Sequence, residues 1–411
     1  MNNNPSKEEI INQAIKFHLQ GNIQEAIKYY QKSISQGCND PGVFCNYGAI
    51  LTNLGKLKEA ESSYRKAILL DPNFAIAYFN LSLLKYSNIN NESWKNQLFS
   101  ENILNSKSQV EKIDIYFARS NVLHKEANFK ESSQYLHLAN NLKQKLNPSN
   151  VGRLLHRSKK LFLESNKEVV NNKKYTKFPQ NIFIVGMPRS GSTLLESIIS
   201  MNRDVHDLGE INILEESFLK WKIPNQKSTI AQLYLKKRNT FSSKLSTTTN
   251  KWLYNYLYTG IISTQIPNAK IIHCYRNPLD NILSIYRAHF DKGNEYSSSL
   301  VDCARLYLDQ EEIMTKYKKR FRAKIYDLNY DSLVSNPDKE IKSLISWLGW
   351  KWDDQYLSPH LNSRSVTTAS NVQVRSAINS KSIGGWKNYK EMLRPAMEII
   401  TKKDKYKNLN Y

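Results

Sequence analysis

The chain has 411 residues, a net charge of +22 and an apolar fraction of 40%. It is longer than one hydrophobic core usually allows, so we expect two domains. It has no run of about 18 apolar residues, which excludes a membrane-spanning helix, and its N-terminus lacks the basic-then-apolar pattern of a secretory signal, so we expect a soluble, cytoplasmic protein.

Positive charge is concentrated in the second part of the chain. Residues 1–150 contain 17 Lys and Arg against 13 Asp and Glu, whereas residues 151–411 contain 42 against 24. This excess favours anionic ligands, including nucleotides, nucleic acid, sulfated or phosphorylated polymers and acidic peptides. The sequence has no recognised nucleic-acid-binding motif, so we expect no nucleic-acid partner. The four cysteines are widely spaced, which indicates reduced, buried thiols and not a metal site.

The first part contains an internal repeat. Two segments that begin at Gly21 and Gly55 align 34 residues apart, a period at which helix pairs stack as a solenoid. Residues 74–86 and 128–144 add two less regular helices of the same kind. The segments resemble tetratricopeptide repeats, whose large, small and turn positions are occupied here by Phe44, Gly48, Gly55, Ala60, Tyr64, Ala67 and Pro72. We therefore expect a helical repeat domain over residues 1–146, with a surface for a protein or peptide partner or for self-association.

The pattern changes after the repeats. Residues 147–180 lose periodicity and gain Asn, Lys and Pro, which predicts a connector. Strands then alternate with helices, which predicts an α/β domain over residues 181–411, similar to P-loop folds, with a mostly parallel sheet covered on both faces. The predicted strands are 181–186, 269–276 and 323–330, and the helices that follow them are 192–200, 277–290 and 336–349.

The turn after the first predicted strand, FIVGMPRSGST (183–193), has the form of a phosphate-binding loop. Gly186 and Gly191 would expose backbone N–H groups at a helix N-terminus, which suits a phosphate. A triphosphate-binding loop needs lysine where this chain has Ser192, and its Mg²⁺ needs an acidic residue at a neighbouring strand end. That strand ends instead in Arg276, which would repel a metal and bind a second phosphate together with Ser284. The sequence thus predicts a nucleotide with phosphates at two places and no metal.

These motifs resemble the sulfotransferases that use 3′-phosphoadenosine 5′-phosphosulfate, over residues 180–390, and most of all the branch that contains tyrosylprotein sulfotransferases and bacterial enzymes with tetratricopeptide repeats. Arg276 with Ser284 resembles their 3′-phosphate site, and Tyr330 in NYDSL resembles a tyrosine that contacts the co-substrate. TASNVQVRSAI and SIGGWKNY resemble their C-terminal binding segments, although Gly385 stands where the family has a basic residue, a contact that Lys387 could replace. PRSGSTL resembles their 5′-phosphosulfate loop, formed here by Arg189, Ser190, Gly191, Ser192 and Thr193.

The resemblance also implies catalytic roles. Glu210 matches the glutamate of this branch's Gly-Glu pair, the general base, and His206 is its rival because imidazole titrates near neutrality. Lys251 and Ser370 resemble the lysine and serine that stabilise the transition state, and Arg189 is placed to stabilise the leaving phosphate. The further candidate phosphate contacts are Arg287 and Arg375. The histidines expected to be structural are His273, His289 and His360.

The leading hypothesis is metal-independent, in-line transfer of a sulfuryl group to a hydroxyl of a protein tyrosine, a sugar or a metabolite. Two alternatives stay open. One is a P-loop enzyme that transfers a phosphoryl group, against which the missing lysine at position 192 weighs. The other is a catalytically inactive protein that acts through its repeats, which Gly385 keeps open.

Overall fold

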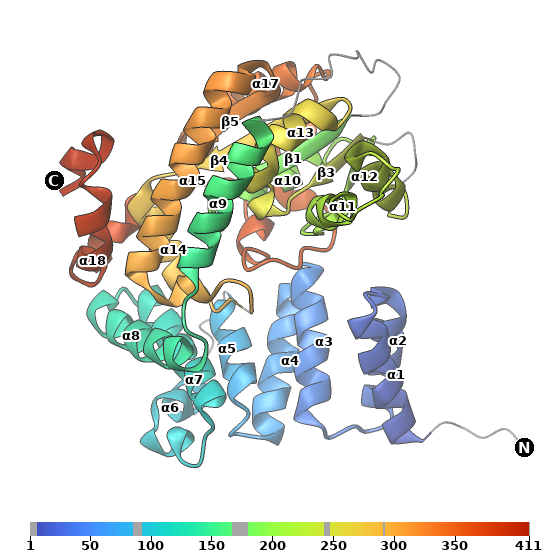
Figure 1. Cartoon of the computed structure of the whole chain (residues 1–411). Coiled ribbons are helices and arrows are strands. Elements are labelled where there is room, and N and C mark those ends of the chain that lie inside the picture. The colour runs from blue at the N-terminus through green and yellow to red at the C-terminus, as the bar shows by residue number, and fades with distance from the viewer. Residues whose placement is uncertain (1–5, 85–92, 167–179, 242–246, 291, 411) are drawn as a thin grey trace, which may run out of the picture. The chain divides into compact units, whose positions relative to one another are not determined.

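The computed structural model describes residues 6–84, 93–166, 180–241, 247–290 and 292–410 (Figure 1). The chain divides into two compact units. The repeat unit contains the described residues up to Asn147 together with Ser363–Gln373, and the α/β unit contains those of Pro148–Asn362 and from Val374 onward. No helix within the described ranges is both long and apolar enough to cross a membrane.

The repeat unit consists of helices joined by short turns. Helix α1 packs against α2, α3 against α4, and α7 against α8, so neighbours in the chain form pairs (Figure 1). Their bounds are α1 Lys7–Leu19, α2 Ile23–Ser35, α3 Pro41–Asn53, α4 Leu57–Leu70, α5 Ala75–Leu83, α6 Ser93–Phe99, α7 Gln109–Lys125 and α8 Phe129–Leu146. The predicted helical repeat region is therefore confirmed.

The alternation of small and large residues explains how α3 and α4 approach each other. A Cβ atom added to Gly48 on α3 would lie only 2.7 Å from the Cε1 atom of Tyr64 on α4. Hydrogen in place of a side chain therefore leaves room for the ring. The hydroxyl of Tyr64 in turn lies 3.0 Å from Oγ1 of Thr52, which satisfies both buried polar groups.

A segment from far along the chain completes the repeat unit. Residues Ser363–Gln373, which we call the strap, meet the end of α3. The backbone N–H of Val366 donates to the carbonyl oxygen of Asn53 at 2.9 Å, and Nδ2 of Asn371 donates to Oδ1 of Asn53 at 2.8 Å. Val372 packs against the apolar cluster of the repeats. The predicted division assigned these residues to the α/β domain, whereas they pack on the repeats.

The predicted connector also contains a regular element. Residues Val151–Asn166 form helix α9, and residues 167–179 lie outside the described residues. Leu161 on α9 is buried in an apolar cluster that includes Tyr317. The helix was not predicted, because the many polar residues of this segment obscure its periodicity. It is amphipathic, and its apolar face packs on the α/β unit.

The α/β unit is built on a five-stranded sheet with the order β2-β3-β1-β4-β5, in which all the described pairings are parallel. The strands are β1 Asn181–Gly186, β2 Val205–Asp207, β3 Thr247–Asn250, β4 Ala269–Tyr275 and β5 Ile325–Asn329. The expected α/β class with a parallel sheet is thus confirmed. Strands β2 and β3 were not predicted, because VHD and TTTN are short and lack an apolar run.

Both faces of the sheet are covered by helices. Along β1, Phe183 and Val185 belong to one apolar cluster, whereas Ile182 and Ile184 belong to another. Side chains of a strand alternate between faces, so the continuous apolar run NIFIV reflects burial on both sides. The helices of this unit, besides α9, are α10 Ser192–Ile199, α11 Ile213–Trp221, α12 Ile230–Arg238, α13 Thr259–Gln265, α14 Pro278–Tyr286, α15 Leu300–Phe321, α16 Tyr330–Ser335, α17 Pro337–Leu348 and α18 Lys390–Ile400.

Candidate functional site

The sheet brings distant candidate residues to one edge. Parallel strands end at the same edge, and ligands of open α/β sheets bind outside their carboxyl ends. Each of the five strands is followed within three positions by a predicted site residue: Arg189 after β1, Glu210 after β2, Lys251 after β3, Arg276 after β4 and Tyr330 after β5. Residues that are far apart in sequence therefore gather on one edge.

Two glycines make the turn between β1 and α10 possible. Gly186 has φ of 145°, and a Cβ there would lie 2.2 Å from the carbonyl oxygen of Cys274 on β4. Gly191 has φ of 92°, and a Cβ there would lie 2.2 Å from the Cδ2 atom of Tyr330. Both positions combine a left-handed backbone with contact on a neighbour, so any side chain would displace the loop.

The loop presents polar groups at the start of α10. Nδ2 of Asn281 on α14 donates to the carbonyl oxygen of Pro188 at 2.9 Å, and this hydrogen bond anchors the loop to α14. Ser192 and Thr193 are buried in the first turn of α10. Ser190 is 1% exposed, and its hydroxyl has no hydrogen-bond partner within the described part of the chain. A buried hydroxyl without a partner is costly, which indicates a position for a bound acceptor such as a phosphate oxygen.

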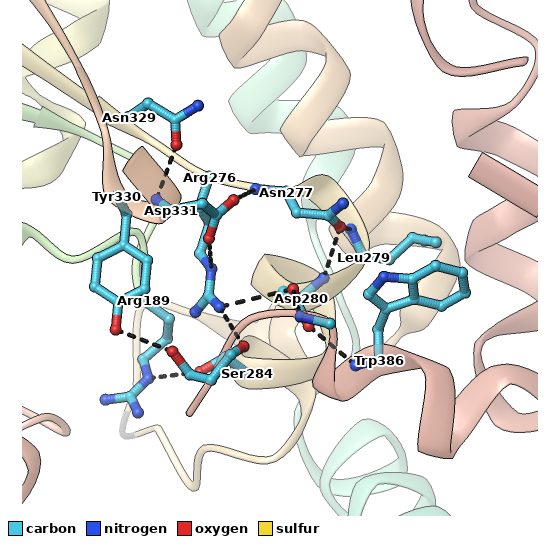
Figure 2. A network of polar contacts seen from close by, with 12 residues as sticks. Arg189, Arg276, Asn277, Leu279, Asp280, Ser284, Asn329, Tyr330, Asp331 and Trp386 are labelled. Atoms are coloured by element: carbon cyan, nitrogen blue, oxygen red, sulfur yellow. Dashed lines mark hydrogen bonds and ion pairs between the residues drawn. The ribbon is translucent and has the colours of Figure 1, made fainter. Parts of the chain in front are cut away.

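Arg276 is held from several sides (Figure 2). Its guanidinium lies 4.7 Å from the centre of the Tyr330 ring and donates through Nη2 to the carbonyl oxygen of Ser382 at 2.8 Å. The hydroxyl of Tyr307 donates to the carbonyl oxygen of Arg276 at 2.8 Å. Nε of Arg276 is buried and makes no hydrogen bond to the described residues. The side chain is thus fixed while one donor stays open.

Two carboxylates organise the surroundings of Arg276. Asp280 lies 3.9 Å from Nη2 of Arg276, and its oxygens accept the backbone N–H groups of Gly384 at 2.7 Å and Trp386 at 2.9 Å (Figure 2). Asp331 lies 3.9 Å from Nε of Arg276 and accepts the backbone N–H of Asn277 at 2.8 Å. Both carboxylates therefore accept hydrogen bonds from backbone N–H groups. Those that Asp280 accepts connect the SIGGW segment to α14.

Three arginines share this region. Nε of Arg189 donates to the hydroxyl of Ser284 at 3.0 Å (Figure 2). Burial, reinforced by the positive charges of Arg276 and Arg287, lowers the pKa of Arg189 to about 10. These like charges repel one another, and an anion with two or more negative charges would relieve that repulsion.

The ends of β2 and β3 carry a second charged group. Lys251 is 0% exposed, and its Nζ donates to Oε1 of Glu210 at 2.5 Å. The side chain of Glu210 is 45% exposed. Oε2 of Glu196, a buried residue on α10, lies 3.8 Å from the same Nζ atom. The backbone N–H of Lys251 also donates to the carbonyl oxygen of Gly209 at 2.8 Å, so the two strand ends are joined.

Comparison with known proteins gives a family match within the α/β unit. Residues 179–233 and 218–354 match the family model described as sulfotransferase family. These residues form a sulfotransferase domain. Residues 41–74 match a tetratricopeptide repeat, and both resemblances seen in the sequence are thereby confirmed.

The sulfotransferase domain and the repeats together have a relative in an uncharacterised protein of Aquifex aeolicus, which is 28% identical over 390 residues. That match covers 87% of this chain but 50% of the relative, so the chain spans half the relative's length. A Caenorhabditis briggsae protein with the provisional name protein-tyrosine sulfotransferase is 24% identical over 244 residues, covering 51% of this chain and 81% of the relative. Among solved structures, the sulfotransferase domain of the Synechococcus PCC 7002 olefin synthase matches 55% of this chain and 97% of its own, at 17% identity and a TM-score of 0.40.

The environments of the remaining candidate residues say less about their roles. The Arg287 guanidinium lies 5.9 Å from the centre of the Tyr389 ring, and burial lowers its pKa. Arg375 donates through Nη1 to the carbonyl oxygen of Asn362 at 2.6 Å. Lys387 is exposed. Ser370 belongs to the strap and thus to the repeat unit, so its part in the site stays a prediction.

The histidines and cysteines differ in environment. His206 on β2 is exposed. His273 is buried between Asp327 and Gln310, at 3.2 Å and 2.8 Å, and burial lowers its pKa, as suits a structural residue. All four thiols are free, and Cys38 is half-buried whereas the other three are buried. In the described ranges no group of three or more His, Cys, Asp and Glu side chains could hold a metal ion.

Sequence reasoning missed three carboxylates: Glu196, Asp280 and Asp331. Asp280 had a signal, because it follows Arg276 by four residues on a predicted helix, where opposite charges meet. Asp331 follows Tyr330 directly and lay inside a recognised motif. Glu196 gave no sign in the sequence, since a helical glutamate is usually exposed.

Proposed function

We propose that the sulfotransferase domain moves a sulfuryl group from 3′-phosphoadenosine 5′-phosphosulfate to a hydroxyl acceptor without a metal ion. One observation carries this proposal: two candidate phosphate sites, each with an arginine, follow neighbouring strands, namely the loop after β1 and Arg276 after β4. The co-substrate has phosphates on two separate oxygens of its ribose and therefore needs two such sites. The open donors Ser190 Oγ and Arg276 Nε, one in each site, support the assignment.

The two sites divide the work of binding. The N–H groups at the start of α10 and the hydroxyls of Ser190, Ser192 and Thr193 would hold the 5′-phosphosulfate. Arg276 and Ser284 would hold the 3′-phosphate, and Tyr330, whose ring lies against the Arg276 guanidinium, would border the nucleotide. The candidate contacts Arg287, Arg375 and Lys387 belong to the same proposal.

The chemical step is an in-line displacement at sulfur. The acceptor oxygen forms a bond to sulfur as the bond between sulfur and the 5′-phosphate oxygen breaks. The acceptor's proton passes to the Glu210 carboxylate, and the electron pair of the broken bond stays on the 5′-phosphate. Arg189 and the backbone N–H groups of the loop would stabilise this negative charge, while Lys251 and Ser370 would stabilise charge on the sulfuryl oxygens.

Glu210 is the better candidate for the base than His206. Its carboxylate accepts a hydrogen bond from the buried ammonium of Lys251, which fixes its direction, and yet it is exposed enough for an acceptor to reach it. A base must lie within hydrogen-bond reach of the proton that it removes, so a fixed and accessible carboxylate meets the geometric requirement first.

The acceptor is proposed as a hydroxyl group, and protein tyrosine is the first acceptor to test. This choice follows the name of the Caenorhabditis briggsae relative. A sugar hydroxyl or a small metabolite would use the same base and the same co-substrate, so the test must include all three.

Binding is tested by calorimetry with 3′,5′-adenosine bisphosphate, the co-substrate's product. We expect equal affinity in EDTA and in Mg²⁺. Tight binding of ATP that requires Mg²⁺, with none of the bisphosphate, would favour a phosphoryl-transferring enzyme instead.

Turnover is tested by incubating the protein with radiolabelled co-substrate and either tyrosine-containing peptides, glycans or fractionated cell extract. We expect label in one acceptor class and release of the bisphosphate. Bisphosphate binding with no turnover on any acceptor would favour a catalytically inactive protein that acts through its repeats.

A further inference from the structure

Glu196 is a glutamate that is buried among apolar side chains. It lies on α10 and is 2% exposed, and its neighbours Leu195, Ile198 and Ile199 are buried in the sheet's apolar core. Burying a carboxylate costs free energy unless it has partners. Its partners include Nζ of Lys251, 3.8 Å from Oε2, and the hydroxyl of Thr249, 3.5 Å from Oε1. A leucine at this position would be buried at a lower free-energy cost, which indicates that the carboxylate has a role other than packing.

The ionisable groups near Lys251 come from α10, from the end of β2 and from β4. Glu196 on α10 and Glu210 after β2 are both within 4 Å of the Lys251 ammonium after β3. On β4, burial raises the pKa of the Cys274 thiol although the charge of Lys251 opposes this shift, so the thiol is neutral. The Lys251 ammonium thus contacts two carboxylates.

The two carboxylates differ in their exposure. The side chains of Glu196 and Lys251 are 2% and 1% exposed, whereas the side chain of Glu210 is 45% exposed. An acceptor can therefore approach Glu210 but not Glu196, so that Glu196 can act on the acceptor only through Lys251 and Glu210.

We propose that Glu196 is a positioning residue for the proposed transfer. Glu196 holds the Lys251 ammonium in place and opposes its positive charge. The Glu210 carboxylate thereby stays oriented by Lys251 and still able to accept a proton. The inference rests on the proposed function, because it concerns the strength of the proposed base. A carboxylate whose sole close partner were a buried ammonium would bind a proton poorly. The negative charge of Glu196, 3.8 Å from the Lys251 ammonium, opposes the effect of that ammonium, so Glu210 accepts the acceptor's proton more readily with Glu196 in place.

The test is Glu196→Gln, which keeps the shape of the side chain and removes its charge. Lys251 then acts on Glu210 without an opposing charge, so Glu210 binds a proton less readily. We expect the acidic limb of the pH profile of kcat/KM to move to lower pH and kcat above that limb to fall about ten-fold, because a weaker base removes the proton more slowly. KM for the co-substrate and affinity for 3′,5′-adenosine bisphosphate should not change.

Three further variants make the result specific. Glu196→Asp keeps the charge and should restore most of kcat and the wild-type pH profile. Glu196→Leu should give the same shifted profile as Glu196→Gln, and it serves if the amide variant does not fold. Glu398→Gln removes the charge of an exposed glutamate on α18 and should change neither limb nor rate.

The outcomes separate the two proposals. A wild-type protein that transfers no sulfuryl group would overturn the proposed function. An active wild type together with a Glu196→Gln variant of unchanged pH profile and kcat would overturn the role of Glu196 and leave the proposed function intact. Equal losses in Glu196→Asp and Glu196→Gln would also overturn it, because they would show that shape and not charge matters.

Discussion

Arg276 and Glu210 follow β4 and β2 at the same edge of the sheet, but their surroundings suit different tasks. Arg276 is 6% exposed and is fixed by Tyr330, Ser382 and two carboxylates, as suits a residue that binds a fixed anion. Glu210 is half exposed and has one cation beside it, as suits a residue that meets an exchanging acceptor. We therefore expect substitutions of Arg276 to affect co-substrate binding and substitutions of Glu210 to affect proton transfer.

We predict that Arg276→Ala weakens 3′,5′-adenosine bisphosphate binding by about 1.5 to 3 kcal/mol, the contribution of a hydrogen bond to a charged group. Glu210→Gln should leave that affinity unchanged and lower turnover by about 10²- to 10⁴-fold, because the base acts in the transition state. Calorimetry and initial rates measure the two effects. The control variant is Arg305→Ala, an exposed arginine on α15 that should alter neither. Full activity of Glu210→Gln with an inactive His206→Ala would transfer the role of base to His206.

At the scale of elements, the turn between β1 and α10 depends on Gly191. The position has φ of 92°, and a Cβ there would meet the ring of Tyr330, which also packs on Arg276. The turn therefore links the loop, the end of β5 and the Arg276 site through direct contact. A side chain at residue 191 would disturb both proposed phosphate sites at once.

We predict that Gly191→Ala lowers the free energy of unfolding by about 1 to 3 kcal/mol, through backbone strain and overlap with Tyr330, and abolishes measurable bisphosphate binding. Denaturant unfolding and calorimetry measure these effects. Gly152→Ala is the matched control, because Gly152 lies in helix α9 with open space around its Cα and alanine favours helices. Equal behaviour of the two variants would show that the turn tolerates a side chain.

At the scale of the whole molecule, the chain crosses between its two units more than once. The strap leaves the α/β unit after Asn362, packs on the repeats and returns at Val374. It carries Ser370, a candidate for the transition state, and ends beside Arg375, a candidate phosphate contact. The repeat unit thus includes a segment that bears Ser370, one of the predicted site residues.

We predict that Asn53→Ala loosens the strap, because it removes the side-chain hydrogen bond to Asn371. Loss of about 1 kcal/mol should speed amide hydrogen exchange within residues 363–373 about five-fold, as measured by mass spectrometry. Asn12→Ala, an exposed asparagine on α1, is the control. Unchanged exchange in the strap would show that Val372 and the backbone contact of Val366 hold it without the side chain of Asn53.

The sequence by itself determined the repeat helices, the class of the second unit and the two phosphate motifs. These features depend on local physics: a 34-residue period, apolar runs, and glycines where the backbone turns at a helix N-terminus. Only the tertiary structure revealed β2 and β3, the strap and the carboxylates that surround Arg276 and Lys251. Short polar strands such as TTTN are stable only between neighbours, and a buried glutamate such as Glu196 is recognised only when its cation lies beside it. Both depend on contacts between residues far apart in the chain, which no local pattern records.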